Sequence, residues 1–253
     1  GRPLHTGGND SPRPASQRAA AFILTAIMLT SLTAPAFAET WHIENGDITI
    51  SAGKDGNDVT QKGTTTYGDK DTIITGTSDE NTVTIDAKND KVEVTLDNVN
   101  IKTDSGSALT SKGDVTLTLK GDNHLTGGIS DNGNYGLSGI SSSGSLTISG
   151  GETDSLTAQG GSGTDGSGGR GIFSKDLTIS GGTVNANGGD GKNGSGGSGI
   201  TSLGSLTISG GTVNAAGGDG TNSSDGGDGI TNNRGVTISS GGTVTAKGGS
   251  GED

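Results

Sequence analysis

The chain has 253 residues, with 51 glycines, no cysteine and only 2% aromatic side chains. Without cysteine it forms neither disulfide bonds nor thiolate metal sites, and with so few aromatic rings its core must consist of smaller side chains. The formal charge is -12, from 16 basic and 28 acidic residues. Because binding to nucleic-acid phosphates requires clustered lysine and arginine, this acidity argues against nucleic acid as a partner.

Residues 1–38 have the pattern of a secretory signal peptide. An apolar run from Ala19 to Leu32 follows two arginines and leads to a small-x-small cleavage sequence at 36–38. The run is shorter than the roughly 20 apolar residues that usually span a bilayer, which predicts a signal peptide and no stable membrane span. We expect cleavage before Glu39 and a secreted or cell-surface protein. Without residues 1–38 the chain holds 13 basic and 27 acidic side chains, a net charge of -14.

A unit of about 30 residues repeats through the remainder of the chain. The string Leu-Thr-Ile-Ser-Gly-Gly begins at Leu146, Leu177 and Leu206, and a variant begins at Val236. A Gly-Ile pair precedes each string and a second short segment follows it, with apolar and polar residues alternating. This alternation is the periodicity of β-strands. The repeat therefore predicts an all-β fold, a parallel β-helix (solenoid) with about 30 residues per coil and Gly-rich inserts.

Equivalent residues of neighbouring units should stack as ladders, because successive coils of a β-solenoid lie about 4.8 Å apart. Small aliphatic side chains suit such a narrow interior, and proline, which would remove a backbone donor, does not occur after Pro35. We expect five inward ladders: Ile140, Ile172, Ile200 and Ile230; Leu146, Leu177, Leu206 and Val236; Ile148, Ile179, Ile208 and Ile238; Leu156, Val184, Val213 and Val244; and Ala158, Ala186, Ala215 and Ala246.

Upstream of the regular repeats the alternation continues more loosely. We expect residues 39–105 to form an N-terminal cap and leading coils, because an uncapped first coil would expose an open sheet edge. Residues 106–253 are expected to form the regular coils. The chain starts with Gly rather than Met and stops inside a repeat unit, so we expect a fragment whose repeats are truncated at the C-terminus.

A glycine-rich polar insert connects each unit to the next. The pattern Gly-Gly-x-Gly-x-Asp/Asn, in which x is any residue, begins at Gly160, Gly188, Gly217 and Gly248. It is similar to the calcium-binding nonapeptide repeat, but the spacing is about 30 residues and the apolar residue after the Asp is missing. A solvated turn, in which glycine supplies positive φ and Asp caps the turn, is the favoured interpretation.

Carboxylates on adjacent coils predict a second way to bind calcium. Asp190 and Asp219 lie 29 residues apart and should be neighbours, and a shared cation would relieve their mutual repulsion. The candidate calcium ligands are Asp165, Asp190, Asp219, Asp225 and Asp228. The alternative is a hydrated acidic surface that keeps a secreted protein soluble.

The combination of Leu-Thr-Ile-Ser-Gly-Gly-Thr-Val-Asn-Ala, a Gly/Asp-rich insert and Gly-Ile resembles a family of secreted bacterial carbohydrate-binding domains, over roughly residues 75–250. The resemblance implies a right-handed parallel β-helix that binds Ca²⁺ and an acidic polysaccharide such as pectin or polygalacturonate. In that family an Asp often stands directly before Gly-Ile. Here only Asp228 does, and Ser138, Arg170 and Ser198 occupy the matching positions.

The first functional hypothesis is a non-catalytic carbohydrate-binding module for acidic, polyuronate-like polysaccharide, secreted or on the bacterial cell surface. A chain with a charge of -14 does not attract a polyanion unaided, so calcium bridging or a local basic spot is required. Arg170 and Arg234 are candidate partners for uronate carboxylates, although solvated loop arginines are the simpler interpretation of both. The outward rows expected to contact the glycan are Thr183 and Asn185 and, one coil on, Thr212 and Asn214.

Two alternatives stay open. Columns of outward threonine and serine suit a structural or adhesive surface repeat, although threonine is a common outward strand residue. A polysaccharide lyase-like enzyme would need a base such as Arg170 or Lys175 beside the α-proton. Because no compact catalytic constellation interrupts the repeat, we predict that the chain is not an enzyme.

Overall fold

Strands form nearly all of the regular structure. The computed structural model describes residues 38–252, which form a parallel β-solenoid of about seven turns with roughly 30 residues per coil. The predicted all-β solenoid is therefore confirmed. The predicted signal peptide lies outside the described residues, apart from Ala38, which is the first residue of β1.

The described residues contain strands β1 to β18 and one short 3-10 helix, η1. Their bounds are β1 (Ala38–His42), η1 (Ile43–Asn45), β2 (Ile48–Ala52), β3 (Asn57–Gln61), β4 (Thr64–Asp69), β5 (Asp71–Ser78), β6 (Val83–Lys102), β7 (Leu109–Lys120), β8 (Asp122–Thr126), β9 (Ile140–Gly150), β10 (Ser155–Gln159), β11 (Ile172–Ile179), β12 (Thr183–Asn187), β13 (Ile200–Ser202), β14 (Leu206–Ile208), β15 (Gly211–Ala216), β16 (Ile230–Asn232), β17 (Val236–Ile238) and β18 (Gly242–Lys247).

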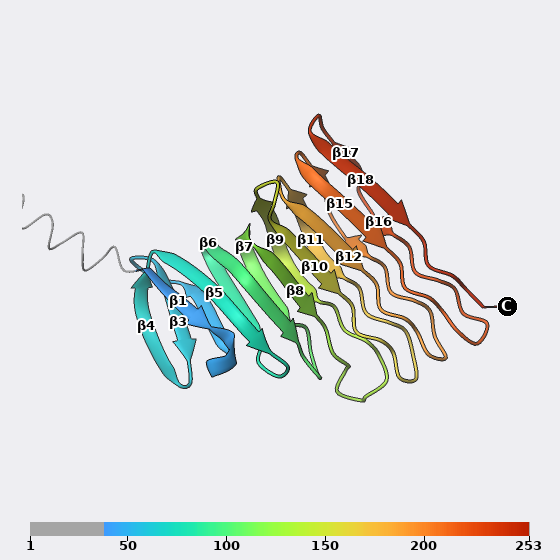
Figure 1. Ribbon diagram of the computed structural model, residues 1–253, viewed down its shortest axis with the longest axis horizontal. Coiled ribbons are helices and arrows are strands. Elements are labelled where there is room, and N and C mark those ends of the chain that lie inside the picture. Colours follow the sequence, from blue (N-terminus) through green and yellow to red (C-terminus); the bar gives the residue numbers. More distant parts are fainter. Residues whose placement is uncertain (1–37, 253) are drawn as a thin grey trace, which may run out of the picture. The chain divides into compact units, whose positions relative to one another are not determined.

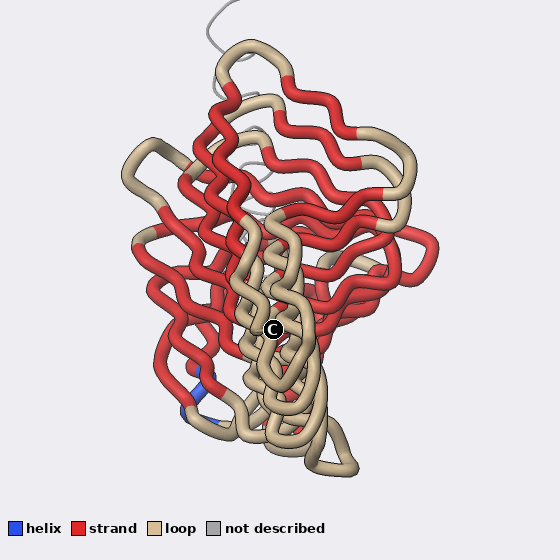
Figure 2. The backbone as a smooth tube through the Cα atoms, turned by 90° about the vertical axis from the view of Figure 1, so that its right-hand side faces the viewer, coloured by secondary structure: helices blue, strands red, loops and turns tan. Residues whose placement is uncertain are grey.

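The coils build three walls of parallel strands, seen from the side in Figure 1 and along the solenoid axis in Figure 2. The first wall contains β2, the first parts of β6, β7, β9 and β11, then β13 and β16. The second wall contains β1, β5, later parts of the same long strands, β14 and β17. The third wall contains the end of β6, then β8, β10, β12, β15 and β18.

The strand register confirms all five predicted ladders. Ile172, for example, pairs with the equivalent isoleucine of the coil on each side. Ladder members in the inner coils are 0–2% exposed and belong to one continuous core. In the last coil Val236 and Ile238 keep the register but are 43% and 52% exposed, because within the described residues only one neighbouring coil covers them.

The first coils depart from the parallel pattern, because β3 pairs antiparallel with both β2 and β4. The loose alternation of residues 39–105 does not predict this arrangement. Beside it, the Nε1–H of Trp41 donates to Oδ2 of the buried Asp69 (2.9 Å). Oδ1 of Asp69 accepts the backbone N–H groups of Glu39 and Asp71 (3.3 and 3.2 Å). A buried carboxylate needs such partners, and these contacts fasten the start of β1 to the start of β5.

The glycine-rich inserts form a second hydrogen-bonded stack beside the walls, visible as the tan loops in Figure 2. Each insert runs out and back as two arms, and N–H groups donate across the arms and between coils. Bonds of 2.7–2.8 Å link one continuous series, which we call the glycine stack: Gly249 to Gly227, Gly227 to Gly218, Gly218 to Gly197, Gly197 to Gly189, Gly189 to Gly169 and Gly169 to Gly161.

Close approach of backbones, rather than turn geometry, explains these glycines. No residue of the glycine stack has a positive φ. A methyl group on Gly197 would lie 1.9 Å from the carbonyl oxygen of Gly169, and one on Gly189 would lie 2.0 Å from that of Gly161. Any larger residue would therefore force the coils apart. The positive-φ explanation of the insert glycines is wrong for these arms.

Substitution of Gly217 by Ala tests this packing. The added methyl group would lie 1.8 Å from the carbonyl oxygen of Gly227, so we expect a loss of about 1–3 kcal/mol in the free energy of unfolding. Gly248 occupies the same position one coil on, where the nearest atom to such a methyl group is 3.7 Å away. Gly248→Ala should therefore change stability by less than about 0.5 kcal/mol. Urea denaturation of both variants makes the comparison, and equal losses would contradict the packing explanation.

Candidate functional site

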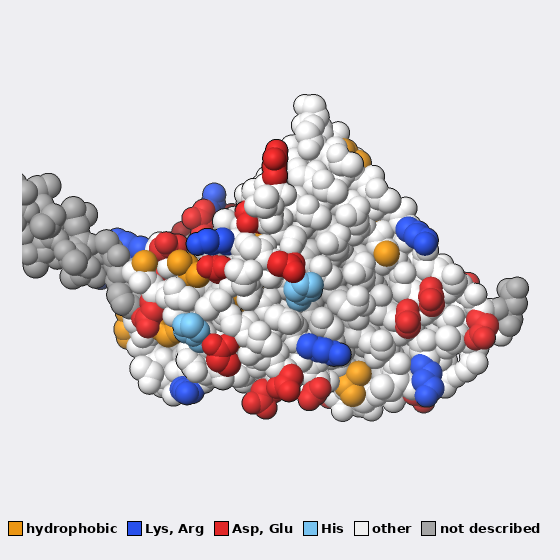
Figure 3. All heavy atoms as spheres, in the orientation of Figure 1, with side chains coloured by type: hydrophobic (Ala, Val, Ile, Leu, Met, Phe, Trp, Pro, Cys, Tyr) orange, Lys and Arg blue, Asp and Glu red, His pale blue; other side chains and the backbone are white. Residues whose placement is uncertain are grey.

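The outward residues of β12 and β15 form a polar surface, which we call the amide face: Thr183, Asn185, Thr212 and Asn214. The register pairs Thr183 with Thr212 and Asn185 with Asn214, as predicted. Asn214 Nδ2–H donates to Asn185 Oδ1 (3.0 Å). Figure 3 shows the surface over β10, β12 and β15 almost free of charged side chains. The two predicted rows are therefore neighbours on one neutral hydrogen-bonding surface.

A groove of about 440 Å³ borders the amide face where the second wall meets the third. Thr183, Thr212 and Thr243 line it together with glycines from four coils, and Glu152 is the charged residue in its lining. At this corner the glycines do supply the turn, since the φ angles of Gly182, Gly211 and Gly241 are +80°, +76° and +100°. The glycine-lined corner leaves the threonines of successive coils open to a ligand from one side.

A second groove, of about 640 Å³, lies at the corner between the first and second walls. We call it the basic groove, and its lining residues are Lys175, Asp176, Leu203, Gly204, Ser205 and Arg234. Buried serines close this corner from inside, because Ser174 Oγ–H donates to the carbonyl of Asp176 (2.8 Å) and Ser202 Oγ–H to that of Ser205 (2.9 Å). The residues directly after these serines, Lys175 and Leu203, are exposed.

Asp176 is the carboxylate of the basic groove, and it is held by the next coil. Its Oδ1 accepts the backbone N–H of Ser205 (2.8 Å) and the hydroxyl of the same residue (3.1 Å). The backbone hydrogen bond is the largest cause of a pKa for Asp176 below its usual value of 3.8, and the hydroxyl, Lys175 and Arg234 lower the pKa further against the effect of desolvation. Asp176 is therefore ionised at neutral pH and fixes the position of the Ser205 turn.

The two cations of the basic groove act on Asp176 at a distance, without an ion pair among the described residues. All ion pairs found among residues 38–252 lie elsewhere, so neither Lys175 nor Arg234 forms one with a described residue. Leu203, on the coil between them, is 44% exposed. Because coils are about 4.8 Å apart, the backbones of Lys175 and Arg234, two coils apart, are separated by roughly 10 Å, and Leu203 lies on the coil between them. This arrangement suits a ligand that carries several carboxylates and an apolar face.

Asp190 and Asp219 are neighbours, as their spacing predicts, but each carboxylate already stabilises the backbone of the next coil. Oδ1 of Asp190 accepts the N–H of Asp219, and Oδ1 of Asp219 accepts that of Ser250, both at 2.8 Å. Both carboxylates therefore stabilise the contact between successive inserts. Each keeps its second oxygen for another partner.

The other candidate calcium ligands lie apart from this pair. Asp165 Oδ1 accepts Nδ2–H of Asn193 (2.9 Å), and Asp228 Oδ2 accepts the hydroxyl of Thr231 (3.0 Å). Asp225 accepts an insert N–H through its backbone carbonyl (3.0 Å). The five aspartates therefore do not form one site.

The aspartates fit a calcium ion only in part. Calcium takes six to eight oxygen ligands, whereas Asp190 and Asp219 supply two carboxylates of which one oxygen each is already engaged. Across the part of the chain that the structure describes, no three His, Cys, Asp or Glu side chains gather where they could hold a metal. A calcium ion at this pair would need most of its ligands from elsewhere.

The two predicted arginines do not share a site. Arg170 precedes β11, whereas Arg234 follows β16 at the opposite end of the first wall's strands. The guanidinium carbon of Arg170 lies 5.0 Å from the centroid of the Phe173 ring, a cation–π contact. Ser198 and Asp228 take its place in the next two coils. Their carbonyls accept the N–H groups of Gly171 and Gly199, each on the coil before (3.1 and 2.9 Å). Of the two arginines, Arg234 is the one that lines a groove.

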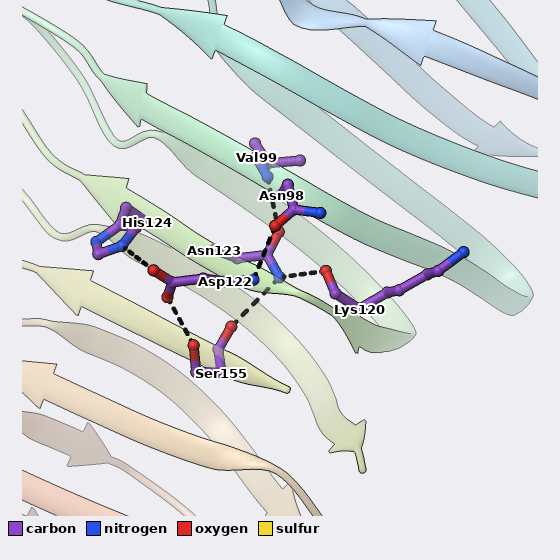
Figure 4. A network of polar contacts seen from close by, with 7 residues as sticks. All are labelled: Asn98, Val99, Lys120, Asp122, Asn123, His124 and Ser155. Carbon is purple, nitrogen blue, oxygen red and sulfur yellow. Dashed lines mark hydrogen bonds and ion pairs between the residues drawn. The ribbon is translucent and has the colours of Figure 1, made fainter. Parts of the chain in front are cut away.

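A polar network on β8 brings a histidine, a carboxylate and a serine together (Figure 4). Asp122 accepts the hydroxyl of Ser155 through Oδ1 (2.6 Å) and contacts His124 Nε2 through Oδ2 (3.0 Å). The Ser155 hydroxyl, then His124, lowers the pKa of Asp122. In a catalytic triad the histidine stands between the serine and the carboxylate, whereas here the carboxylate stands between the other two. The network therefore joins β8 to β10 in an order that differs from that of a catalytic triad.

Comparison with protein-family models, curated proteins and solved structures finds no match to this chain. Among residues 38–252, no helix has the length and apolar character needed to cross a membrane. The assignment of a site therefore depends on the geometry of the chain itself.

From the sequence, Lys175 is only a candidate lyase base, and Leu203 is not identified as a binding residue. One signal points to both: they directly follow the serines Ser174 and Ser202, which pair with each other in the register. Ser111 and Ser142 belong to the same column two and one coils earlier. A small polar residue that repeats at the end of the Gly-Ile strand marks a corner, and the next residue is free to vary. A cation directly after such a serine, as Lys175 is, indicates a candidate groove at the corner.

Acid should weaken the solenoid through its carboxylates. The pKa values of Glu44, Asp122, Asp154 and Asp176 are all lowered, chiefly by hydrogen bonds from Thr77, Ser155, Gly121 and Ser205 respectively. A carboxylate with a lowered folded-state pKa adds stability above its unfolded value, and this contribution is lost as the pH falls through the folded value. We therefore expect the melting temperature to fall as the pH is lowered from about 5 to about 2.

The variant Asp154→Asn tests this assignment. Oδ1 and Oδ2 of Asp154 accept the N–H groups of Gly121 (2.9 Å) and Gly151 (2.8 Å), and an amide nitrogen in place of one oxygen does not accept. We expect a lower melting temperature at neutral pH and a shallower decrease on acidification, measured by circular dichroism. A variant that loses stability equally at every pH would show that the charge of Asp154 has no part in it.

Proposed function

We propose that this chain is a secreted, non-catalytic module that binds an acidic, polyuronate-like polysaccharide, with the basic groove as its anchoring site. The observation that carries the proposal is the pair formed by Lys175 and Arg234, which line one groove and have no ion-pair partner among the described residues. Arginine and lysine bind carboxylates through charge-assisted hydrogen bonds. A uronate chain supplies carboxylates with which these two cations can form ion pairs.

Local charge reconciles such a ligand with an acidic protein. The net charge of residues 39–253 is -14, so long-range attraction of a polyanion is unfavourable. In the basic groove, however, two cations face one carboxylate, and that carboxylate is held by Ser205. Because screening limits the reach of distant charges to about 8 Å at physiological ionic strength, the groove can be locally attractive.

The surface beside the basic groove suits an extended glycan. Leu203 offers an apolar contact in the groove, and the outward residues of the adjoining second wall are a column of threonines, Thr147, Thr178, Thr207 and Thr237. Hydroxyl groups at about 4.8 Å intervals can exchange hydrogen bonds with the hydroxyls of a polymer that runs along the axis. These contacts support binding of a chain rather than of a single sugar.

The same geometry supports binding without catalysis. Glycoside hydrolysis uses two carboxyl groups flanking the bond that is cleaved, whereas Asp176 is the one carboxylate among the described residues that line the basic groove. In the network of β8 and β10 the serine hydroxyl donates to the carboxylate and does not contact the histidine. Neither place offers the pair of carboxyl groups that glycoside hydrolysis uses.

Calcium enters the proposal only as an ion shared with the glycan. Asp190 and Asp219 supply at most two carboxylates at one place, so carboxylates of a bound polyuronate would have to provide further oxygen ligands. Such an ion would bridge two anionic surfaces and would relieve their repulsion.

The double substitution Lys175→Gln with Arg234→Gln tests the anchoring site. Loss of both cations is expected to weaken binding to polygalacturonate by about tenfold, since each exposed charge pair contributes up to about 1 kcal/mol. Raising the ionic strength should weaken the unchanged protein in the same direction. Affinity electrophoresis or calorimetry with polygalacturonate measures both effects.

The matched control is Lys54→Gln with Lys62→Gln, which removes the same charge from exposed residues near the antiparallel strands. We expect it to leave the affinity within about twofold, because neither lysine lines the basic groove. If the control weakens binding as much as the groove variant does, overall charge rather than the basic groove governs the interaction.

Chelation tests the calcium part separately. We expect EGTA to reduce the affinity for polygalacturonate, and Asp190→Asn with Asp219→Asn to remove most of this sensitivity. The reason is that the bridging ion would lose its protein ligands. Binding that is equally strong with added calcium and with EGTA would remove calcium from the proposal and leave the basic groove as its basis.

A further inference from the structure

The loop Ser130–Tyr135 presents a tyrosine at the outer end of the inserts. Tyr135 is 48% exposed, yet its backbone is firmly held. Its N–H donates to Ser130 Oγ (3.1 Å) and its carbonyl accepts the N–H of Ser130 (2.8 Å). The hydroxyl of Ser130 donates to Oδ1 of Asn132 (2.6 Å), which also accepts the N–H of Asn134 (3.0 Å). The loop is therefore closed on itself before any ligand arrives.

The insert of the following coil holds the Ser130–Tyr135 loop through hydrogen bonds. The backbone N–H groups of Thr164 and Asp165 both donate to the carbonyl of Asn134 (2.9 and 3.2 Å), and the Thr164 hydroxyl donates to the carbonyl of Gly133. The tyrosine is thus carried by a loop that the following coil fixes, and little ordering entropy remains to be lost when it binds.

The ring of Tyr135 rests against the backbone of Gly166. A methyl group at Gly166 would lie 2.7 Å from both Cδ1 and Cε1 of the ring, so only glycine allows the ring to settle there. The ring is close-packed against this backbone and half open to solvent. Aromatic rings with this combination of support and exposure are well suited to stacking on a flat apolar surface.

A row of polar side chains continues from the tyrosine along the insert ends. Asp165, next to Gly166 in the chain, accepts Nδ2–H of Asn193 (2.9 Å), and Asn193 Oδ1 accepts Nδ2–H of Asn222 one coil further on. Each amide nitrogen has two hydrogens and donates one within the row. The second hydrogen, and the second oxygen of Asp165, are available to the hydroxyls of a ligand. We call Tyr135 and this row the tip platform.

We propose that the tip platform is a second binding site, for the pyranose rings of a neutral saccharide. The ring of Tyr135 would stack on the apolar face of one sugar, and Asp165, Asn193 and Asn222 would exchange hydrogen bonds with the hydroxyls of the sugars that follow. Successive members of the row stand about 4.8 Å apart, so the row continues under an extended chain. This site is separate from the basic groove and does not depend on the function proposed for it.

Charge selects the neutral class of saccharide. The titratable groups on the tip are Asp131 in the tyrosine loop, Asp165, Lys192 beside Gly166, and Glu252, which accepts the N–H of Asn222 (2.8 Å). Three carboxylates against one ammonium group repel a uronate. A neutral sugar avoids this repulsion and still uses carboxylate and amide groups as hydrogen-bond partners. The tip platform and the basic groove would therefore take different glycans.

The chain contains only two tyrosines, Tyr67 and Tyr135, so ring signals report binding directly. The full chain is labelled with ¹³C-tyrosine, and its two ring signals are assigned with Tyr135→Phe. The probes are cellohexaose, mannohexaose and xylohexaose, with hexagalacturonate as the charged comparison. We expect the Tyr135 signal to shift with at least one neutral probe, and the signal of Tyr67, which is 72% exposed, to stay in place.

Variants then locate the contact. Tyr135→Ala should weaken binding of that probe by about tenfold, whereas Tyr135→Phe, which keeps the ring, should change it by less than about threefold. Tyr67→Ala is the matched control and should leave the affinity unchanged. The double variant Lys175→Gln with Arg234→Gln should also bind the neutral probe normally, which separates this site from the basic groove.

Three results would overturn the tip platform. The first is no shift of the Tyr135 signal with any neutral probe at millimolar concentration. The second is an equal shift of both tyrosine signals, which indicates non-specific contact. The third is a larger effect of hexagalacturonate than of every neutral hexasaccharide, which contradicts selection by charge. Thermal unfolding of each variant confirms that a lost shift is not a lost fold.

Discussion

The structure depends on one constraint: each coil must return to the same register after roughly 30 residues, so that backbone N–H and C=O groups meet those of the coil before. The aliphatic ladders, the serines at the first corner and the glycine stack all satisfy this constraint in different parts of the coil. The stack is the strictest of them, because a single methyl group at Gly197 or Gly189 would lie within 2.0 Å of a carbonyl oxygen. Packing, and not hydrophobicity alone, therefore limits these positions.

The ladders could be predicted from the sequence because their information is local. Ile172 and Ile200 each sit after a glycine and before an alternating segment, so equal spacing places them in contact. The reason for the insert glycines cannot be found from neighbouring residues in the sequence. Gly197 is read in the sequence as a turn residue, and only the approach of Gly169 from another coil reveals why it has no side chain. The antiparallel pairing of β3 gave no regular spacing to detect.

The candidate sites show the same division. The interval between Asp190 and Asp219 predicted that they would be neighbours, but not that each would accept a backbone N–H from the next coil. The spacing of equivalent residues gives adjacency, whereas the partner of a carboxylate depends on side-chain rotamers and turn geometry that the repeat does not specify. Lys175 and Arg234 stand two coils apart in turns of different sequence, so no repeated string connects them.

Regularity and function therefore occupy different residues. Positions that must meet their equivalents in the next coil keep the same kind of residue from unit to unit, as the Ile-Ile and Thr-Thr pairs of β11 and β14 and the Leu-Val pair of β10 and β12 show. Positions after a closed corner or at the end of an insert meet no such demand, because the backbone there is already fixed by Ser174 or by the Ser130–Tyr135 loop. The charged side chain of Lys175 and the ring of Tyr135 therefore disturb neither the aliphatic ladders nor the packing of the core. In a repeat protein of this kind, the residues that break the pattern on a supported backbone are the ones to test for binding.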